Sequence, residues 1–194
     1  RFRSKRGTPL YSELRIRTVA YMTDWFFEQA RLGKMYHCAT TGAVTLSTVS
    51  ATCTGLSLEN PYGSGKLVVM KTARFAPSTA PAGAAPVGLA ISAAVSQTAV
   101  THTTPAVIHN GITTGSNLNV GVAKLDSSST LPAAPVWFLP LGGAVAGSSI
   151  TPALIWADID GSVILPGGTN ISFSYLTTAA VGIAYFSWAE IDDV

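Results

Sequence analysis

The sequence predicts a mainly β fold, a sandwich or barrel, with a basic N-terminal arm and one early helix. Three observations predict it. After residue 34, roughly ten short segments rich in Val, Ile, Thr and aromatic residues are each bounded by turn residues. Only the segment before residue 34 has helical periodicity. Charged residues make up 11% of the 194-residue chain, against roughly 25% in an average soluble protein, so we expect part of the surface to be covered by other subunits.

Residues 1–34 form the first predicted unit, an anchoring arm followed by an amphipathic helix. Residues 1–9 have no apolar periodicity and are expected to be extended. Over 18–34, side chains that would share one helix face recur every three or four residues, and Gly33 is the expected stop. These side chains are Val19, Met22, Trp25, Phe26, Gln29 and Leu32. A short strand over 14–21 is the alternative.

Positive charge is concentrated in this first unit. Residues 1–34 contain eight Lys or Arg against three Asp or Glu, a net charge of +5. Residues 35–194 contain four against seven, a net charge of −3. A basic arm on an acidic body predicts docking to an acidic protein surface. Nucleic acid is a less favoured partner, because only Phe2 accompanies the basic residues of the arm as an aromatic side chain.

Residues 35–194 form the second predicted unit, the β-sandwich. The clearest strand is 66–76, where Leu67, Val69, Ala73 and Phe75 are expected on one face and the alternate residues on the other. In 170–176, Ile171 and Phe173 alternate with serines, which predicts one buried face and one wetter face. The predicted strands are 36–40, 44–50, 56–59, 66–76, 87–95, 106–109, 118–124, 136–141, 153–157, 162–165, 170–176 and 181–191.

The chain carries no recognisable metal site. None of its histidines has another His at helical spacing or an acidic residue nearby in sequence, and the spacing of the cysteines matches no zinc pattern. These residues are His37, His102, His109, Cys38 and Cys53. The first residues, RFRSKR, precede no apolar run, so we expect no secretion by the standard route. A disulfide between Cys38 and Cys53 is conceivable, but buried free thiols are favoured.

Motifs for nucleotide binding and catalysis are also missing, so we predict a protein that is not an enzyme and takes no cofactor. The run Gly63-Ser64-Gly65-Lys66 has Asn60 where a phosphate-binding loop needs Gly and Leu67 where it needs Ser or Thr, so a turn into a strand is expected. Asp158 and Asp160 could pair as glycosidase carboxylates, but Asp160-Gly161 is favoured as a hairpin turn. Proline interrupts the long uncharged stretch 75–123, which argues against a membrane span.

Seven residues of the first unit are the candidate contacts with a partner. Three consecutive large rings, Trp25, Phe26 and Phe27, cannot all face one core, so at least one must meet another surface. That surface is either the sandwich itself or, as we favour, a partner subunit. The basic side chains of the arm would pair with carboxylates. The predicted protein-interface residues are Arg1, Arg3, Lys5, Arg6, Trp25, Phe26 and Phe27.

Two stretches resemble a known group of proteins. Residues 54–69, TGLSLENPYGSGKLVV, resemble the T-G-L-x-L-x-N-P-x-G-S-G-K segment of small virion proteins of tailed bacteriophages. Residues 165–169 and 179–191, LPGGT and AAVGIAYFSWAEI, resemble the L-P-G-T…T-A-A-x-G-x-A-x-F-x-W-x-E-I end of the same group. The resemblance spans residues 36–191, and its motifs are turns and strands. Residues 1–34 match least well.

The resemblance implies a jelly-roll-like antiparallel β-sandwich on the capsid surface of a phage particle assembled in the host cytoplasm. It implies a homotrimer that decorates or cements the capsid by binding the major capsid protein or another virion protein, without catalysis or cofactor. The alternative is a receptor- or glycan-binding module of a head fibre or tail, with its site on loops such as 101–104 and 113–116. A hydrolase is the weakest hypothesis.

Overall fold

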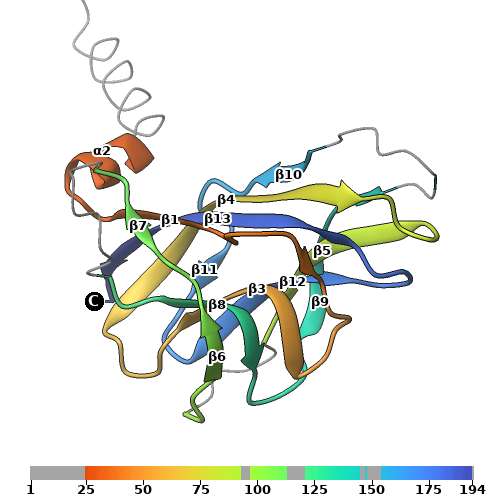
Figure 1. Ribbon diagram of the computed structural model, residues 1–194. Coiled ribbons are helices and arrows are strands. Elements are labelled where there is room, and N and C mark those ends of the chain that lie inside the picture. Colours follow the sequence, from red (N-terminus) through yellow and green to blue (C-terminus); the bar gives the residue numbers. More distant parts are fainter. Residues whose placement is uncertain (1–24, 93–96, 113–120, 145–146, 148–153, 194) are drawn as a thin grey trace, which may run out of the picture.

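The protein is a mainly β sandwich of two antiparallel sheets, seen in the computed structural model (Figure 1). The structure describes residues 25–92, 97–112, 121–144, 147 and 154–193. Within them it has one helix, α2 (Trp25–Arg31), and thirteen strands. The strands are β1 (Met35–Ala39), β2 (Val44–Thr45), β3 (Thr52–Asn60), β4 (Lys66–Thr79), β5 (Ala85–Ile91), β6 (Thr101–Pro105), β7 (His109–Asn110), β8 (Lys124–Thr130), β9 (Val136–Ala144), β10 (Ile155–Asp158), β11 (Ile164–Leu165), β12 (Thr169–Tyr175) and β13 (Val181–Asp192).

The two sheets share the strands almost equally. The first sheet has the order β10-β4-β13-β1-β7, with β11 also paired to β4 and β2 to β13. The second has the order β6-β8-β3-β12-β5-β9. The longest ladder joins β4 and β13, from Val181 opposite Thr79 to Asp192 opposite Lys66. The predicted antiparallel β-sandwich is therefore confirmed at the level of its layers.

The core lies between the sheets and is built from aromatic residues of β4, β12 and β13. The rings of Phe173 and Phe186 stack with centroids 4.6 Å apart, and Phe75 packs 6.3 Å from Phe173. Trp188 is fully buried and stacks on Tyr36 at 5.9 Å. Fully burying one such side chain is worth about 1.5–3 kcal/mol, so this ring cluster holds the two layers together.

A β-bulge at Lys71 corrects the predicted faces of β4. Thr72 pairs with Ser187 but Met70 pairs with Trp188, so Lys71 is an extra residue in the ladder. The bulge exchanges the two faces of the strand. Ala73 and Phe75 point into the core as expected, but before the bulge the core residues are Val68 and Met70. The prediction that Leu67 and Val69 share one face with Ala73 and Phe75 was therefore wrong.

The helix ends where the sequence predicts. Gly33 adopts a φ of 71°, its N–H donates to the carbonyl of Ala30, and the N–H of Lys34 donates to that of Gln29. This pair of bonds is the Schellman arrangement, which needs a left-handed residue at the position of Gly33. The helix is described from Trp25 onward. The arm and the predicted first turns of the helix lie outside the described residues.

The other predicted strands agree with the structure except at 44–50, where only Val44–Thr45 is a strand, and in the polar middle of the chain. Segment 118–124 was expected to be a strand, but the observed strand β8 begins only at Lys124. Segment 106–109 largely connects β6 and β7, and β6 itself was expected to be a loop. The wetter face predicted for β12 is also wrong, because Ser172 and Ser174 are as buried as Ile171 and Phe173.

Both cysteines are buried free thiols, as predicted. Burial raises the pKa of the Cys38 thiol to about 12. Burial also raises the pKa of Cys53, which lies beside Val100 and Leu131 outside the main core. A thiol that stays protonated is a poor nucleophile and a poor metal ligand.

The helix that the structure describes is too short and too polar to cross a membrane.

Candidate interaction surface

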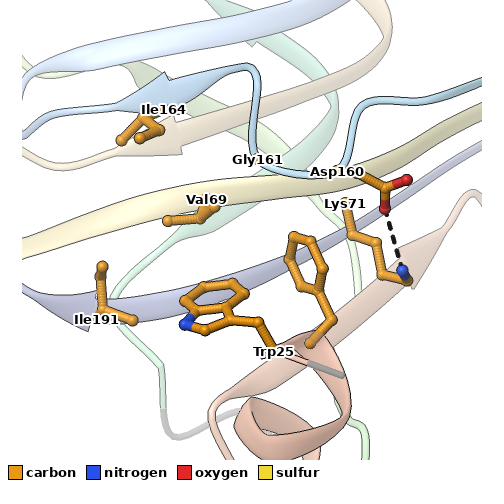
Figure 2. Close-up of a pocket in the computed structure, with 8 residues that line it drawn as sticks. Trp25, Val69, Lys71, Asp160, Gly161, Ile164 and Ile191 are labelled. Atoms are coloured by element: carbon orange, nitrogen blue, oxygen red, sulfur yellow. Dashed lines mark hydrogen bonds and ion pairs between the residues drawn. The ribbon is translucent and has the colours of Figure 1, made fainter. Parts of the chain in front are cut away.

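The helix α2 lies over the outer face of the first sheet and leaves a hollow of about 550 Å³ beneath it. Trp25 projects from the helix toward Val69 and Ile191, as Figure 2 shows. The hollow is lined by Trp25, Phe26, Val69, Lys71, Asp160, Gly161, Ile164 and Ile191. Five of these eight side chains are large and apolar, so the hollow favours an apolar occupant.

The bulge in β4 creates this hollow. It turns Val69 toward the helix, and the carbonyl of Lys71 accepts the N–H groups of Ile159 and Asp160. Asp160 and Gly161 both have positive φ, 43° and 83°, so they form a turn. It is not the predicted hairpin turn, because the flanking strands β10 and β11 both pair with β4 and not with each other. The turn brings the Asp160 carboxylate within 3.2 Å of Lys71 Nζ, which also lies 4.5 Å from the centre of the Phe26 ring. Lys71 therefore joins the helix to the sheet.

A second hollow of about 370 Å³ lies on the other side of Phe26 and is more polar. Its lining includes Phe27, His37, Arg74 and Tyr185. His37 Nδ1 and the Tyr185 hydroxyl are 2.9 Å apart. Burial, with a smaller contribution from His109, lowers the pKa of His37, so its imidazole is neutral at pH 7. The Arg74 guanidinium lies 5.9 Å from the centre of the Tyr185 ring.

The three predicted aromatic contact residues are brought to different surroundings. No residue of α2 is buried, although Trp25 and Phe26 are half-covered by the sheet. Phe27 points away, with 64% of its surface exposed. Arg1, Arg3, Lys5 and Arg6 lie outside the described residues. The interface role of all seven residues stays a prediction.

A buried charged cluster on the second sheet was missed by sequence reasoning. His102 of β6 lies between two carboxylates, with Nδ1 2.5 Å from Asp126 Oδ2 and Nε2 3.1 Å from Glu59 Oε2. The three residues come from β6, β8 and β3, which are neighbours in the sheet but are far apart in the chain. No acidic residue lies near His102 in the sequence, but the fold brings two carboxylates into contact with it.

The cluster holds the edge strand β6 on the sheet. The two carboxylates approach opposite nitrogens of one ring, and a single metal ion could not bind all three side chains in this arrangement. Among the described residues, no group of three or more His, Cys, Asp or Glu side chains is placed to hold a metal ion. We interpret the cluster as structural.

Replacing His102 with alanine is expected to lower the free energy of unfolding by about 2 kcal/mol, because two buried carboxylates lose their partner. The loss is smaller than for a fully buried pair, since 23% of the His102 side chain is exposed and water can reach the gap. Urea unfolding measures it. The exposed His109 is the control, and an equal effect of His109→Ala would contradict the structural role.

The other segments that the sequence suggested as binding sites are a turn and a strand where the structure describes them. Gly63 and Gly65 both have positive φ, and β4 starts at Lys66, so the segment resembling a phosphate-binding loop is the predicted turn. Segment 101–104 belongs to β6, and 113–116 lies outside the described residues.

Comparison of the chain with family models, curated proteins and solved structures finds no match.

Proposed function

We propose that this protein is a non-enzymatic structural subunit of a tailed-bacteriophage virion, which decorates or cements the capsid. The exposed Phe27 on a helix without buried residues carries the proposal. A seven-residue helix gains little stability in isolation. This helix covers an apolar hollow without filling it, and its outermost ring faces solvent. Such a helix has an open apolar side that suits contact with a second protein.

The surroundings of the helix support a protein partner. Phe27, Ile164 and Leu32 are large apolar side chains that remain exposed around the helix. Aromatic residues with apolar surroundings are enriched at the centres of protein interfaces. The basic residues of the arm would add pairing with carboxylates of the major capsid protein. Repetition over a shell makes weak single contacts sufficient, because many subunits are held at once. A jelly-roll connectivity and self-association as a homo-oligomer are part of the proposal.

The test is incorporation of variants into particles. Deleting residues 1–17, or replacing Phe27 with serine, is expected to reduce the copies per particle at least about tenfold, since loss of about 1.4 kcal/mol per contact already gives that factor. Phe138→Ser is the matched control, because Phe138 is 44% exposed on β9 of the other sheet. Quantitative gel analysis of purified particles gives the copy number. Undiminished incorporation of both variants would refute the anchoring role.

Copy number also tests the alternative function, a receptor- or glycan-binding module. A number that matches the capsid lattice supports decoration. A few copies at vertices or tail would instead support a receptor-binding role. No contact among the described residues favours the alternative at present, since its predicted loop 101–104 is a strand anchored by the His102 cluster.

A further inference from the structure

The β10 edge of the first sheet carries an exposed patch that adjoins the second hollow. Trp156 of β10 is 51% exposed, and Ile183 of β13 is 43% exposed. Between them in the sheet lies Arg74 of β4, which pairs in register with both Trp156 and Tyr185. Trp, Tyr and Arg are the residue types that most often dominate binding energy at protein interfaces. The helix α2 lies over β1, β13 and Lys71 of β4, and Arg74 borders the second hollow beside Phe27.

Two opposite charges on this patch have no ion-pair partner. Arg74 and Asp158 are both exposed, and neither takes part in an ion pair within the described part of the chain. They belong to neighbouring strands, but Asp158 pairs in register with Thr72, so the two charges are offset by two residues along β4. Ala157 packs against the core. Trp156 and Asp158 therefore share the outer face.

We propose that a second copy of this chain docks on this patch about a two-fold axis, giving a dimer rather than the trimer that the resemblance implies. In a two-fold interface, residue i of one subunit meets residue j of the other and the reverse contact follows by symmetry. Arg74 would meet Asp158 of the partner subunit, and Asp158 would meet the partner's Arg74. One patch that carries both charges and an exposed Trp is complementary to itself. A different acidic or basic partner would satisfy one charge and leave the other opposed.

The dimensions of the face allow this docking. Packed sheets lie about 10 Å apart, and a helix with its side chains is about 10–12 Å across. A helix on the same face therefore fits beside a sheet-on-sheet contact without holding the layers apart. Neighbouring strands are about 4.8 Å apart. Both ion pairs thus fall close to the axis, where the two Trp156 rings exclude water and strengthen them.

Sedimentation equilibrium of the full chain tests the proposal without any particle, so its outcome is independent of the capsid assignment. The wild-type protein is expected to form dimers. Arg74→Glu and Asp158→Lys should each raise the dimer dissociation constant about 100-fold, because each change affects two symmetric pairs at about tenfold per pair. The double variant Arg74→Glu/Asp158→Lys should restore dimerisation, since the swapped charges again face their opposites.

Controls separate a specific contact from general charge or folding effects. Asp193→Lys makes the same charge change at an exposed residue outside the patch and should leave dimerisation unchanged. Trp156→Ala should weaken the dimer without altering the melting temperature. A wild-type monomer at every concentration would overturn the proposal. A wild-type trimer, or failure of the double variant to associate while its melting temperature is unchanged, would also overturn it.

Discussion

Glu190→Ala is expected to lower the free energy of unfolding by about 3–5 kcal/mol. The Glu190 carboxylate is 4% exposed. It accepts the N–H of Val122 at 2.7 Å, the N–H of Ala123 at 3.1 Å and the indole N–H of Trp188 at 3.2 Å. Removing the carboxylate takes one buried acceptor away from all three donors and leaves a void between β13 and the chain that enters β8.

The effect can be measured by guanidinium unfolding with two companion variants. Glu190→Gln keeps one acceptor oxygen and should lose about half as much, because it removes the charge but not every hydrogen bond. Asp192→Ala, two residues further on, removes an exposed carboxylate that pairs with Lys66 and should change little. If Glu190→Ala were no more destabilising than Asp192→Ala, Glu190 would not support the chain before β8.

Gly182→Ala is expected to lower the free energy of unfolding by about 2–3 kcal/mol through overpacking. Gly182 lies in β13 where the ladder with β4 shifts register. A Cβ atom there would meet the backbone oxygen of Ala76 and would lie 2.7 Å from Phe75 Cζ. A backbone atom and a buried ring cannot both move aside, so the longest ladder of the sandwich must shift.

A matched glycine checks this reasoning. Gly42 has open space where its Cβ would lie, and alanine there should be close to neutral. Thermal unfolding of Gly182→Ala and Gly42→Ala compares the two positions directly. Equal melting temperatures would show that the approach of β4 to Gly182 is looser than in the structure.

The layers of the fold could be predicted because they follow from local patterns. The strand β12 has apolar residues at a period of two, β4 and β13 are rich in apolar residues, and glycine precedes both β4 and β12. The stop at Gly33 follows from the same kind of local rule. These features depend on residues within a few positions of one another, so the sequence alone contains them.

The missed features depend on pairing between distant segments. One extra residue at Lys71 reverses the faces of β4, and no local pattern distinguishes that residue from its neighbours. Strand β8 contains the run Asp126 to Thr130, whose polar residues resemble a loop until β3 and β6 pair with it. The His102 cluster also forms only when these three strands meet. The hollow beneath α2 was missed because it exists only through the bulge.

Because of the bulge, β4 both packs into the core and supports the helix α2. The residues that face the core differ in parity on the two sides of Lys71. On the N-terminal side of Lys71, even-numbered residues stabilise the interior while Val69 supports the helix, and beyond it the odd-numbered residues take over the interior. If the extra residue stood one position earlier or later in β4, the residue between the old and the new position would move from one face of the strand to the other. The contact site for α2 and the core face of the first sheet therefore cannot change independently of each other. Sequence change in β4 is constrained at once by packing in the core and by the contact with α2.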